Sequence, residues 1–220
     1  MSEEILVNVT PFEARVALVE NGVLQEVFIE RERRRGIVGN IYLGKVVRVL
    51  PGMQAAFVDI GLDKASFIHA RDLCPWETST KDPEEQDIRA LLREGQTLLV
   101  QVVKDPIGTK GAKVTASVTL ASRNLVYLPD AQHIGVSAKI EDEQLRETLK
   151  QKLQAAIERV CSQNTAQNLP ALNGGFIVRT AAESQSDGMF EADIHYLARL
   201  WRALQKKITT RDTPSIIYQE

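Results

Sequence analysis

Residues 53–69, MQAAFVDIGLDKASFIH, decide the fold of the middle of this chain. They predict two short strands, Ala55–Ile60 and Ala65–His69, joined by a turn at Gly61–Lys64. Apolar and polar side chains alternate along both strands, which is typical of a sheet with one buried and one wet face. The stretch therefore predicts a β-hairpin.

Two aromatic rings fall on the wet face of that hairpin. Phe57 shares a face with Asp59, whose carboxylate belongs in water, and Phe67 shares a face with His69. Aromatic rings on a polar face suit a platform on which nucleic-acid bases stack. The alternative is that Phe57 and Phe67 fill a barrel core.

Residues 40–121 carry five strand candidates within about eighty residues, as expected for an OB-fold barrel that binds oligonucleotides. A short helix over Gln86–Arg93 is predicted to lie between the third and fourth strands. In the loop that follows the fourth strand, Lys110 can reach a phosphate backbone. The candidates are Ile41–Leu50, Ala55–Ile60, Ala65–His69, Thr97–Val103 and Lys113–Leu120.

Residues 1–39 predict a β-meander that opens a domain completed elsewhere. The strand candidates are Ile5–Val9, Arg15–Glu20 and Val23–Glu30, and Asn21-Gly22 is a strong hairpin signal.

Residues 122–220 change to an α+β pattern. Two amphipathic helices are predicted, the first with Asp142 as its N-cap, on either side of a strand at 176–178. The final apolar run at 216–218 resembles a strand with an unpaired edge. The inward positions of the helices are Leu145, Leu149, Leu153, Ile157 and Val160, then Ile194, Leu197, Trp201, Leu204 and Ile208.

Composition limits the class of protein. A formal charge of −2 and a pI near 6.0 exclude a protein that coats nucleic acid indiscriminately, so any such surface is a local basic patch. Cys74 and Cys161 are far apart, which fits a reducing cytoplasm. We expect no signal peptide and no membrane span, since no apolar run approaches roughly 18 residues. The cations that could form the patch are Lys45, Arg48, Lys64, Lys104 and Lys113.

No catalytic or metal site is predicted in this chain. His69, His133 and His195 have no second ligand at metal spacing. Acidic residues at 59, 63 and 72 spread over strand and turn, whereas a two-metal centre needs convergent carboxylates.

Four motifs occur in this order along the chain: Asn40–Lys45 (NIYLGK), Gln54–Gly61 (QAAFVDIG), Gly108–Ala112 (GTKGA) and Ile177–Ala181 (IVRTA). Together they resemble the N-terminal part of the bacterial ribonuclease E/G family. The opening residues lean towards the ribonuclease G branch. The resemblance covers the whole chain.

The resemblance implies three pieces and two sets of site residues. The pieces are strands of a split ribonuclease-H-like subdomain (1–39), an inserted OB-fold (40–121) and a 5′-phosphate sensor (122–220). Phe57 and Phe67 match aromatics that stack on RNA bases, and Lys110 matches a loop lysine that contacts RNA. Arg179, Thr180 and Val126 match the residues that hold a 5′-monophosphate. The chain departs from the family at Ser122, often glycine, and at Ala138-Lys139, elsewhere Arg-Arg.

The resemblance also implies the activity of a longer parent protein. Such an endoribonuclease cleaves single-stranded RNA with Mg²⁺ in rRNA maturation and mRNA decay, and assembles as a homo-oligomer through a Zn²⁺ site. Its metal-binding carboxylates are expected beyond residue 220, so this chain alone is expected to bind RNA without cutting it. The alternative is a stand-alone, non-catalytic RNA-binding regulator. The unpaired final strand is an argument against that alternative.

Overall fold

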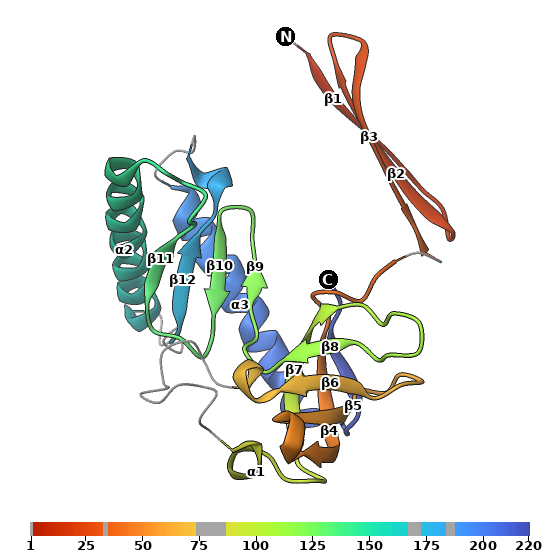
Figure 1. Ribbon diagram of the computed structural model, residues 1–220. Coiled ribbons are helices and arrows are strands. Elements are labelled where there is room, and N and C mark those ends of the chain that lie inside the picture. The colour runs from red at the N-terminus through yellow and green to blue at the C-terminus, as the bar shows by residue number, and fades with distance from the viewer. Residues whose placement is uncertain (1, 33–34, 74–86, 167–172, 184–187) are drawn as a thin grey trace. The chain divides into compact units, whose positions relative to one another are not determined.

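The computed structural model describes residues 2–32, 35–73, 87–166, 173–183 and 188–220. Its internal contacts divide the chain into two units, residues 1–37 and 38–220. The fold is α+β, with a β-meander, a closed five-stranded barrel and two long helices packed on a second sheet (Figure 1). This confirms the predicted fold class. None of the described helices is long and apolar enough to cross a membrane.

The first unit is an antiparallel three-stranded sheet in the order β1-β2-β3. Two residues, Asn21 and Gly22, connect the second strand to the third, and both have positive φ, 49° and 77°. That backbone is the type I′ turn that matches the twist of a hairpin, so the Asn-Gly signal is confirmed. The strands are β1 (Glu3–Val9), β2 (Glu13–Glu20) and β3 (Val23–Arg31).

Five strands of the second unit close into a barrel, because the first, β4, pairs with both β5 and β7. Short helical turns lie at its ends, and Asp87 caps one of them through a 3.0 Å hydrogen bond from the Arg89 amide. The predicted helix Gln86–Arg93 is thus a single turn, and its first residue lies outside the described residues. The elements are β4 (Ile41–Leu50), η2 (Pro51–Met53), β5 (Ala55–Asp59), β6 (Ser66–His69), η3 (Ala70–Asp72), α1 (Ile88–Leu91), β7 (Thr97–Lys104) and β8 (Lys113–Thr115).

The alternation in the β5–β6 hairpin separates core from surface as the sequence predicts. Val58 and Ile68 are fully buried and Ile60 is nearly so, which places them inside the barrel. Phe57 and Phe67 occupy the opposite face and are only partly buried. The two rings therefore do not fill the barrel core.

The predicted strand Lys113–Leu120 is wrong in its second half. The chain turns after Thr115, whose hydroxyl accepts a 3.2 Å hydrogen bond from the Ser117 amide, while the Ala116 amide donates to the Asp72 carbonyl. The chain then enters a different sheet as β9 (Leu120–Ala121). A side-chain hydrogen bond to nearby backbone competes with the strand ladder at this point.

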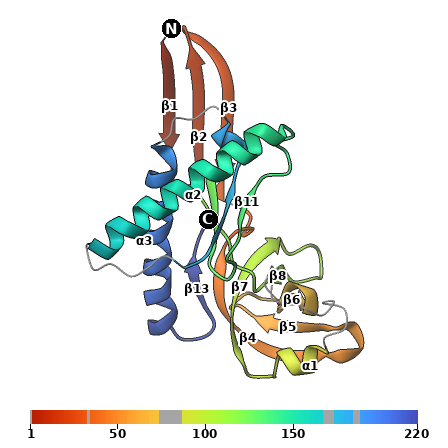
Figure 2. The same cartoon turned by 90° about the vertical axis from the view of Figure 1, so that its left-hand side faces the viewer.

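A four-stranded sheet, ordered β11-β12-β10-β9, follows the barrel. The sequence singled out only β12 among its strands. Helices α2 and α3 pack against this sheet and against each other (Figure 2). Asp142 caps α2 as predicted, accepting from the amides of Gln144 (2.9 Å) and Leu145 (3.2 Å). The elements are β10 (Leu125–Leu128), β11 (Ile134–Val136), α2 (Glu143–Ala166), β12 (Gly175–Val178), η4 (Thr180–Ala182) and α3 (Met189–Thr210).

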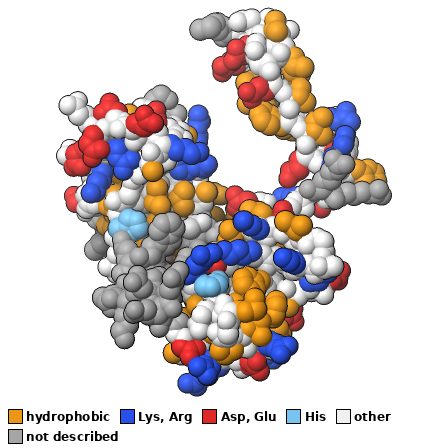
Figure 3. All heavy atoms as spheres, in the orientation of Figure 1, with side chains coloured by type: hydrophobic (Ala, Val, Ile, Leu, Met, Phe, Trp, Pro, Cys, Tyr) orange, Lys and Arg blue, Asp and Glu red, His pale blue; other side chains and the backbone are white. Residues whose placement is uncertain are grey.

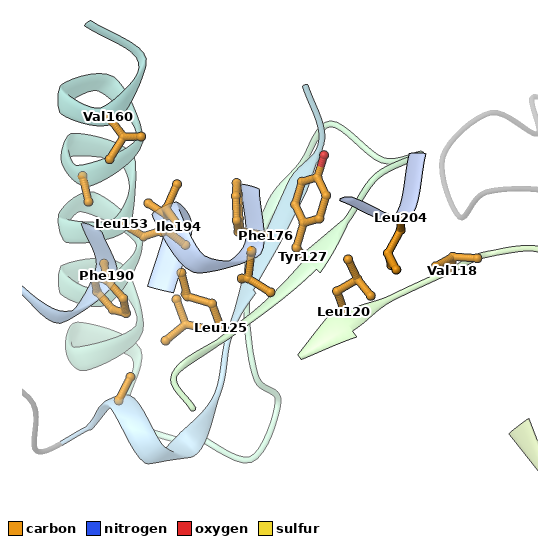
Figure 4. Packing of buried hydrophobic residues seen from close by; sticks show 14 of the residues in the cluster. Val118, Leu120, Leu125, Tyr127, Leu153, Val160, Phe176, Phe190, Ile194 and Leu204 are labelled. Carbon is orange, nitrogen blue, oxygen red and sulfur yellow. The ribbon is translucent and has the colours of Figure 1, made fainter. Parts of the chain in front are cut away.

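The apolar stripes of both helices enter one core with this sheet, as predicted. Figure 4 shows Leu153 of α2 and Ile194 of α3 beside Phe176 of the sheet. Tyr127 lies in the same core and donates its hydroxyl to the Asn173 carbonyl. Burial raises the pKa of the Tyr127 hydroxyl to about 12, so this donor keeps its proton at physiological pH.

The final strand, β13 (Ser215–Tyr218), is paired, which corrects the expectation of an unpaired edge. It lies antiparallel to β4, with Ser215 opposite Leu43 and Tyr218 opposite Ile41. The final strand therefore gives no reason to exclude a stand-alone regulator. Sequence alone could not show this pairing, because the two strands are far apart along the chain.

Leu153→Ala should lower the free energy of unfolding of the second unit by about 2–5 kcal/mol, since it leaves a cavity at a fully buried site. Lys150→Ala, at an exposed position on the same helix, should change it by less than about 0.5 kcal/mol. Urea denaturation followed by helical circular dichroism measures both. Equal effects of the two variants would contradict the core assignment.

Candidate functional site

An apolar groove with a basic border lies on the outer face of the barrel. It encloses about 760 Å³. Figure 3 shows hydrophobic side chains on the barrel with Lys and Arg side chains beside them. The groove contains all three residues predicted to contact RNA, Phe57, Phe67 and Lys110. Its lining residues are Met53, Phe57, Lys64, Ala65, Phe67, Thr109, Lys110, Gly111 and Lys113.

Strand pairing fixes the two aromatic rings of the groove. Phe57 and Phe67 are directly opposite each other in the β5–β6 ladder. Their ring centroids are 6.2 Å apart with an interplanar angle of 68°, an edge-to-face pair of the kind aromatic side chains favour. Both rings remain partly exposed, so each keeps surface that a planar ligand can cover.

The cations of the groove differ in their availability. Lys64 donates from Nζ to the Gly108 carbonyl at 2.5 Å, and Lys113 lies 3.1 Å from the Asp72 carboxylate. Lys110 is exposed in the closing pair of a tight hairpin turn, where its amide and that of Ile107 donate to each other's carbonyls at 3.0 and 3.2 Å. Lys110 is therefore the lysine of the groove best placed to meet a phosphate. The other cations named from the sequence, Lys45, Arg48 and Lys104, are not among the lining residues.

A glycine brings the Lys110 hairpin close to the rings. A Cβ on Gly111 would overlap the Ala65 carbonyl group, whose carbon would be only 2.8 Å away. Next to this contact, the Phe67 amide donates to the Ala112 carbonyl at 2.8 Å. Only glycine lets the hairpin approach β6 this closely.

The residues predicted to sense a 5′ end lie at one end of the β11-β12-β10-β9 sheet. Strands β11 and β12 are parallel, so their carboxyl ends lead into Ser137 and Arg179 side by side. The turn between β9 and β10 lies at the same end, because Leu125 pairs with Val178. Three loops meet here, and their exposed cations are Arg123, Lys139 and Arg179.

Arg179 is held by the β9–β10 turn. Its amide donates to the Asn124 carbonyl at 2.8 Å, and its guanidinium donates to the Ser122 carbonyl. The side chain is nevertheless exposed, so other donors of the guanidinium face solvent. Thr180 is also exposed and begins η4. Val126 is partly buried in β10, opposite Ile177, and lies two residues beyond Asn124.

The structure thus groups the predicted residues into two sites. Phe57, Phe67 and Lys110 share the groove, whereas Arg179, Thr180 and Val126 lie around one sheet end. The sequence did not predict that Met53 and Thr109 also line the groove. Thr109 could have been found as the neighbour of Lys110, but the strand pattern starts after Met53 and gave no signal for it.

No three His, Cys, Asp or Glu side chains among the described residues come together as metal ligands. His69 uses Nδ1 to accept a 3.3 Å hydrogen bond from the Arg71 amide, which is a local backbone contact. We therefore assign no described residue to the Mg²⁺ or Zn²⁺ that the family resemblance implies.

Comparison with known proteins finds relatives that match the whole chain. The family model described as "Ribonuclease E/G family" matches residues 119–220. Ribonuclease G of Escherichia coli K12 is 50% identical over 225 aligned residues, which cover the whole of this chain. The chain resembles the ribonuclease E/G family along its whole length.

The degree of identity differs between the two named branches of the family. Ribonuclease G of Haemophilus influenzae is 50% identical over 99% of this chain, and ribonuclease E of E. coli K12 is 34% identical over 99%. The chain spans 43% of the length of both ribonuclease G sequences and 20% of that ribonuclease E. The predicted likeness to the ribonuclease G branch is confirmed.

Gly111→Ala should lower the free energy of unfolding by about 1–3 kcal/mol, because its methyl group would push the Lys110 hairpin away from β6. Gly52→Ala is the matched control, since a Cβ there would meet no atom within 4 Å. Urea denaturation and amide chemical shifts of Ala65 and Phe67 report the change. Unaltered shifts in Gly111→Ala would contradict the close contact.

Proposed function

We propose that this chain is the RNA-binding and 5′-end-sensing part of a ribonuclease E/G-type endoribonuclease. The observation that carries the proposal is the groove in which Phe57, Phe67 and Lys110 lie together. A platform of aromatic rings beside a cation suits single-stranded nucleic acid. Bases stack on the rings whatever their sequence, and the cation meets the backbone.

The charge distribution supports binding to a limited surface. The chain has a net charge of −2, so attraction to RNA depends on local cations such as Lys110 rather than on the whole molecule. In the described part of the chain, the groove combines apolar surface with Lys64, Lys110 and Lys113. Affinity should fall as salt rises, because each phosphate contact releases counterions.

The sheet end carrying Arg179 and Thr180 is proposed to hold a 5′-monophosphate. A guanidinium offers paired donors that match two phosphate oxygens, and a hydroxyl can add a third. Both side chains are exposed and adjacent in sequence. The partly buried Val126 is proposed to support the pocket through packing and its backbone. Arg123 and Lys139, exposed on neighbouring loops, add positive charge at the same end.

The activity of the parent protein is part of the same proposal. We propose that it hydrolyses single-stranded RNA in rRNA maturation and mRNA decay, acts in the cytoplasm and assembles as a homo-oligomer. Mg²⁺ and Zn²⁺ would serve cleavage and assembly through residues other than those described here. Relatives named ribonuclease G and ribonuclease E support the enzyme over a non-catalytic regulator. A cleavage assay of the full-length protein on single-stranded RNA tests this choice, and binding without cleavage would favour the regulator.

Phe57→Ala combined with Phe67→Ala should weaken binding of a short unstructured RNA at least tenfold. Base stacking on each ring contributes about 1–3 kcal/mol, and 1.4 kcal/mol is about tenfold in affinity. Fluorescence anisotropy titration measures the dissociation constant. Tyr196→Ala removes an exposed ring from α3, outside the groove, and should leave it unchanged. Equal affinity in the double variant and wild type would remove the rings from the RNA site.

Arg179→Ala should abolish a preference for 5′-monophosphate over 5′-hydroxyl RNA. Hydrogen bonds to charged groups contribute about 1.5–3 kcal/mol, which corresponds to roughly tenfold to a hundredfold in affinity. Paired titrations with the two RNAs give the ratio of dissociation constants. Arg199→Ala, an exposed arginine on α3, controls for loss of one charge. A full preference retained by Arg179→Ala would exclude this residue from the pocket.

A further inference from the structure

The turn between β9 and β10 binds Arg179 at two points, its backbone amide and its guanidinium. The Ser122 carbonyl accepts from its guanidinium and the Asn124 carbonyl accepts from its amide. Any movement of this turn therefore moves both the backbone and the charged group of Arg179. The turn itself is closed by a 2.8 Å bond from the Ser122 amide to the Leu125 carbonyl.

Asp193, on the first turns of α3, anchors the turn from outside. Its Oδ2 accepts from the Ser122 hydroxyl and from the Asn124 amide, each at 2.9 Å. The Ser122 hydroxyl oxygen in turn accepts from the Leu125 amide at 3.2 Å. One carboxylate oxygen thus binds the two residues whose carbonyls hold Arg179. Hydrogen bonds to an ionised acceptor are stronger than neutral ones, so this contact is well suited to fix a turn.

The burial around the turn favours a fixed arrangement. Asn124 is completely buried, and its side-chain atoms have no hydrogen-bond partner. The Asn124 backbone is therefore held mainly by Asp193 and Arg179. Removing the carboxylate takes away one of the two hydrogen bonds made by the Asn124 backbone.

We propose that Asp193 is a positioning residue for 5′-phosphate recognition, acting through the Ser122–Asn124 turn to place the guanidinium of Arg179. The inference rests on the proposed function of Arg179 and names no direct contact of Asp193 with RNA. Its Oδ2 accepts from two donors of the turn, the Ser122 hydroxyl and the Asn124 amide. Ser122, a departure from the family's frequent glycine, supplies one of these donors.

The test compares the 220-residue chain with variants, using one unstructured oligoribonucleotide with either a 5′-monophosphate or a 5′-hydroxyl. Asp193→Ala should reduce the preference for the monophosphate about tenfold, a loss equal to one strong hydrogen bond. Affinity for the 5′-hydroxyl RNA, which depends on the barrel groove, should stay within about twofold of wild type. Glu191→Ala is the matched control. Glu191 is also an acid near the start of α3, but it pairs with Arg159 and not with the Ser122–Asn124 turn.

Two further variants separate positioning from a general effect on stability. Asp193→Asn keeps an oxygen that accepts both donors and should restore most of the preference. Asp193→Ala in an Arg179→Ala background should cause no further loss, since the proposed effect passes through Arg179. An additive loss in the double variant, or an unchanged preference in folded Asp193→Ala, would overturn the inference.

If thermal denaturation shows that Asp193→Ala does not fold, the Ser122→Ala variant tests the inference in its place. It removes one donor to Asp193 and leaves α3 intact, so a preference reduced at least threefold supports the inference and an unchanged one refutes it. Failure of the proposed function has a different signature. In that case wild type shows no preference for the monophosphate, and Arg179→Ala changes nothing.

Discussion

Strand β4 is the constraint on which the second unit depends, because it pairs with three other strands. Its first residues pair with β7 and with the final strand β13, and its later residues pair with β5. Ile41 and Leu43 of this strand belong to the same buried cluster as Leu204 of α3 and Ile217 of β13. The barrel and the helix-covered sheet are therefore joined by one core, and the groove and the Arg179 site lie within one unit.

Local patterns in the sequence predicted much of this structure. Alternation in residues 55–69 placed Phe57 and Phe67 outside the barrel, and the Asn21-Gly22 turn and Asp142 cap were recognised from side-chain chemistry. The predictions that were wrong depend on contacts between residues far apart in the sequence. The partner of β13 lies far away in sequence, and the end of β8 depends on a hydrogen bond to the Asp72 carbonyl. The division into parts at residues 39 and 121 and the roles of the site residues stay predictions.

The two candidate sites differ in the kind of contact that they offer a ligand. The groove offers partly exposed rings with Lys110 at its border, so it suits ligands whose contact is mainly planar and apolar. The Arg179 site offers a guanidinium and the Thr180 hydroxyl beside a turn that a carboxylate fixes, which suits a compact anion. The residues of this site come from several separate segments. A sequence motif identified Arg179, whereas no motif indicated Asp193. Only the fold brings a helix residue to that turn.

The edge-to-face angle of the two phenylalanine rings limits the shape of anything that covers both. Consecutive bases in a regular helix are parallel, whereas rings inclined at 68° cannot each receive one of two parallel planes. A strand that used both rings would have to bend its backbone between neighbouring nucleotides. Unpaired, pliable RNA can make that bend, and a rigid duplex cannot, so the geometry of one hairpin would discriminate by strandedness without reading a single base edge.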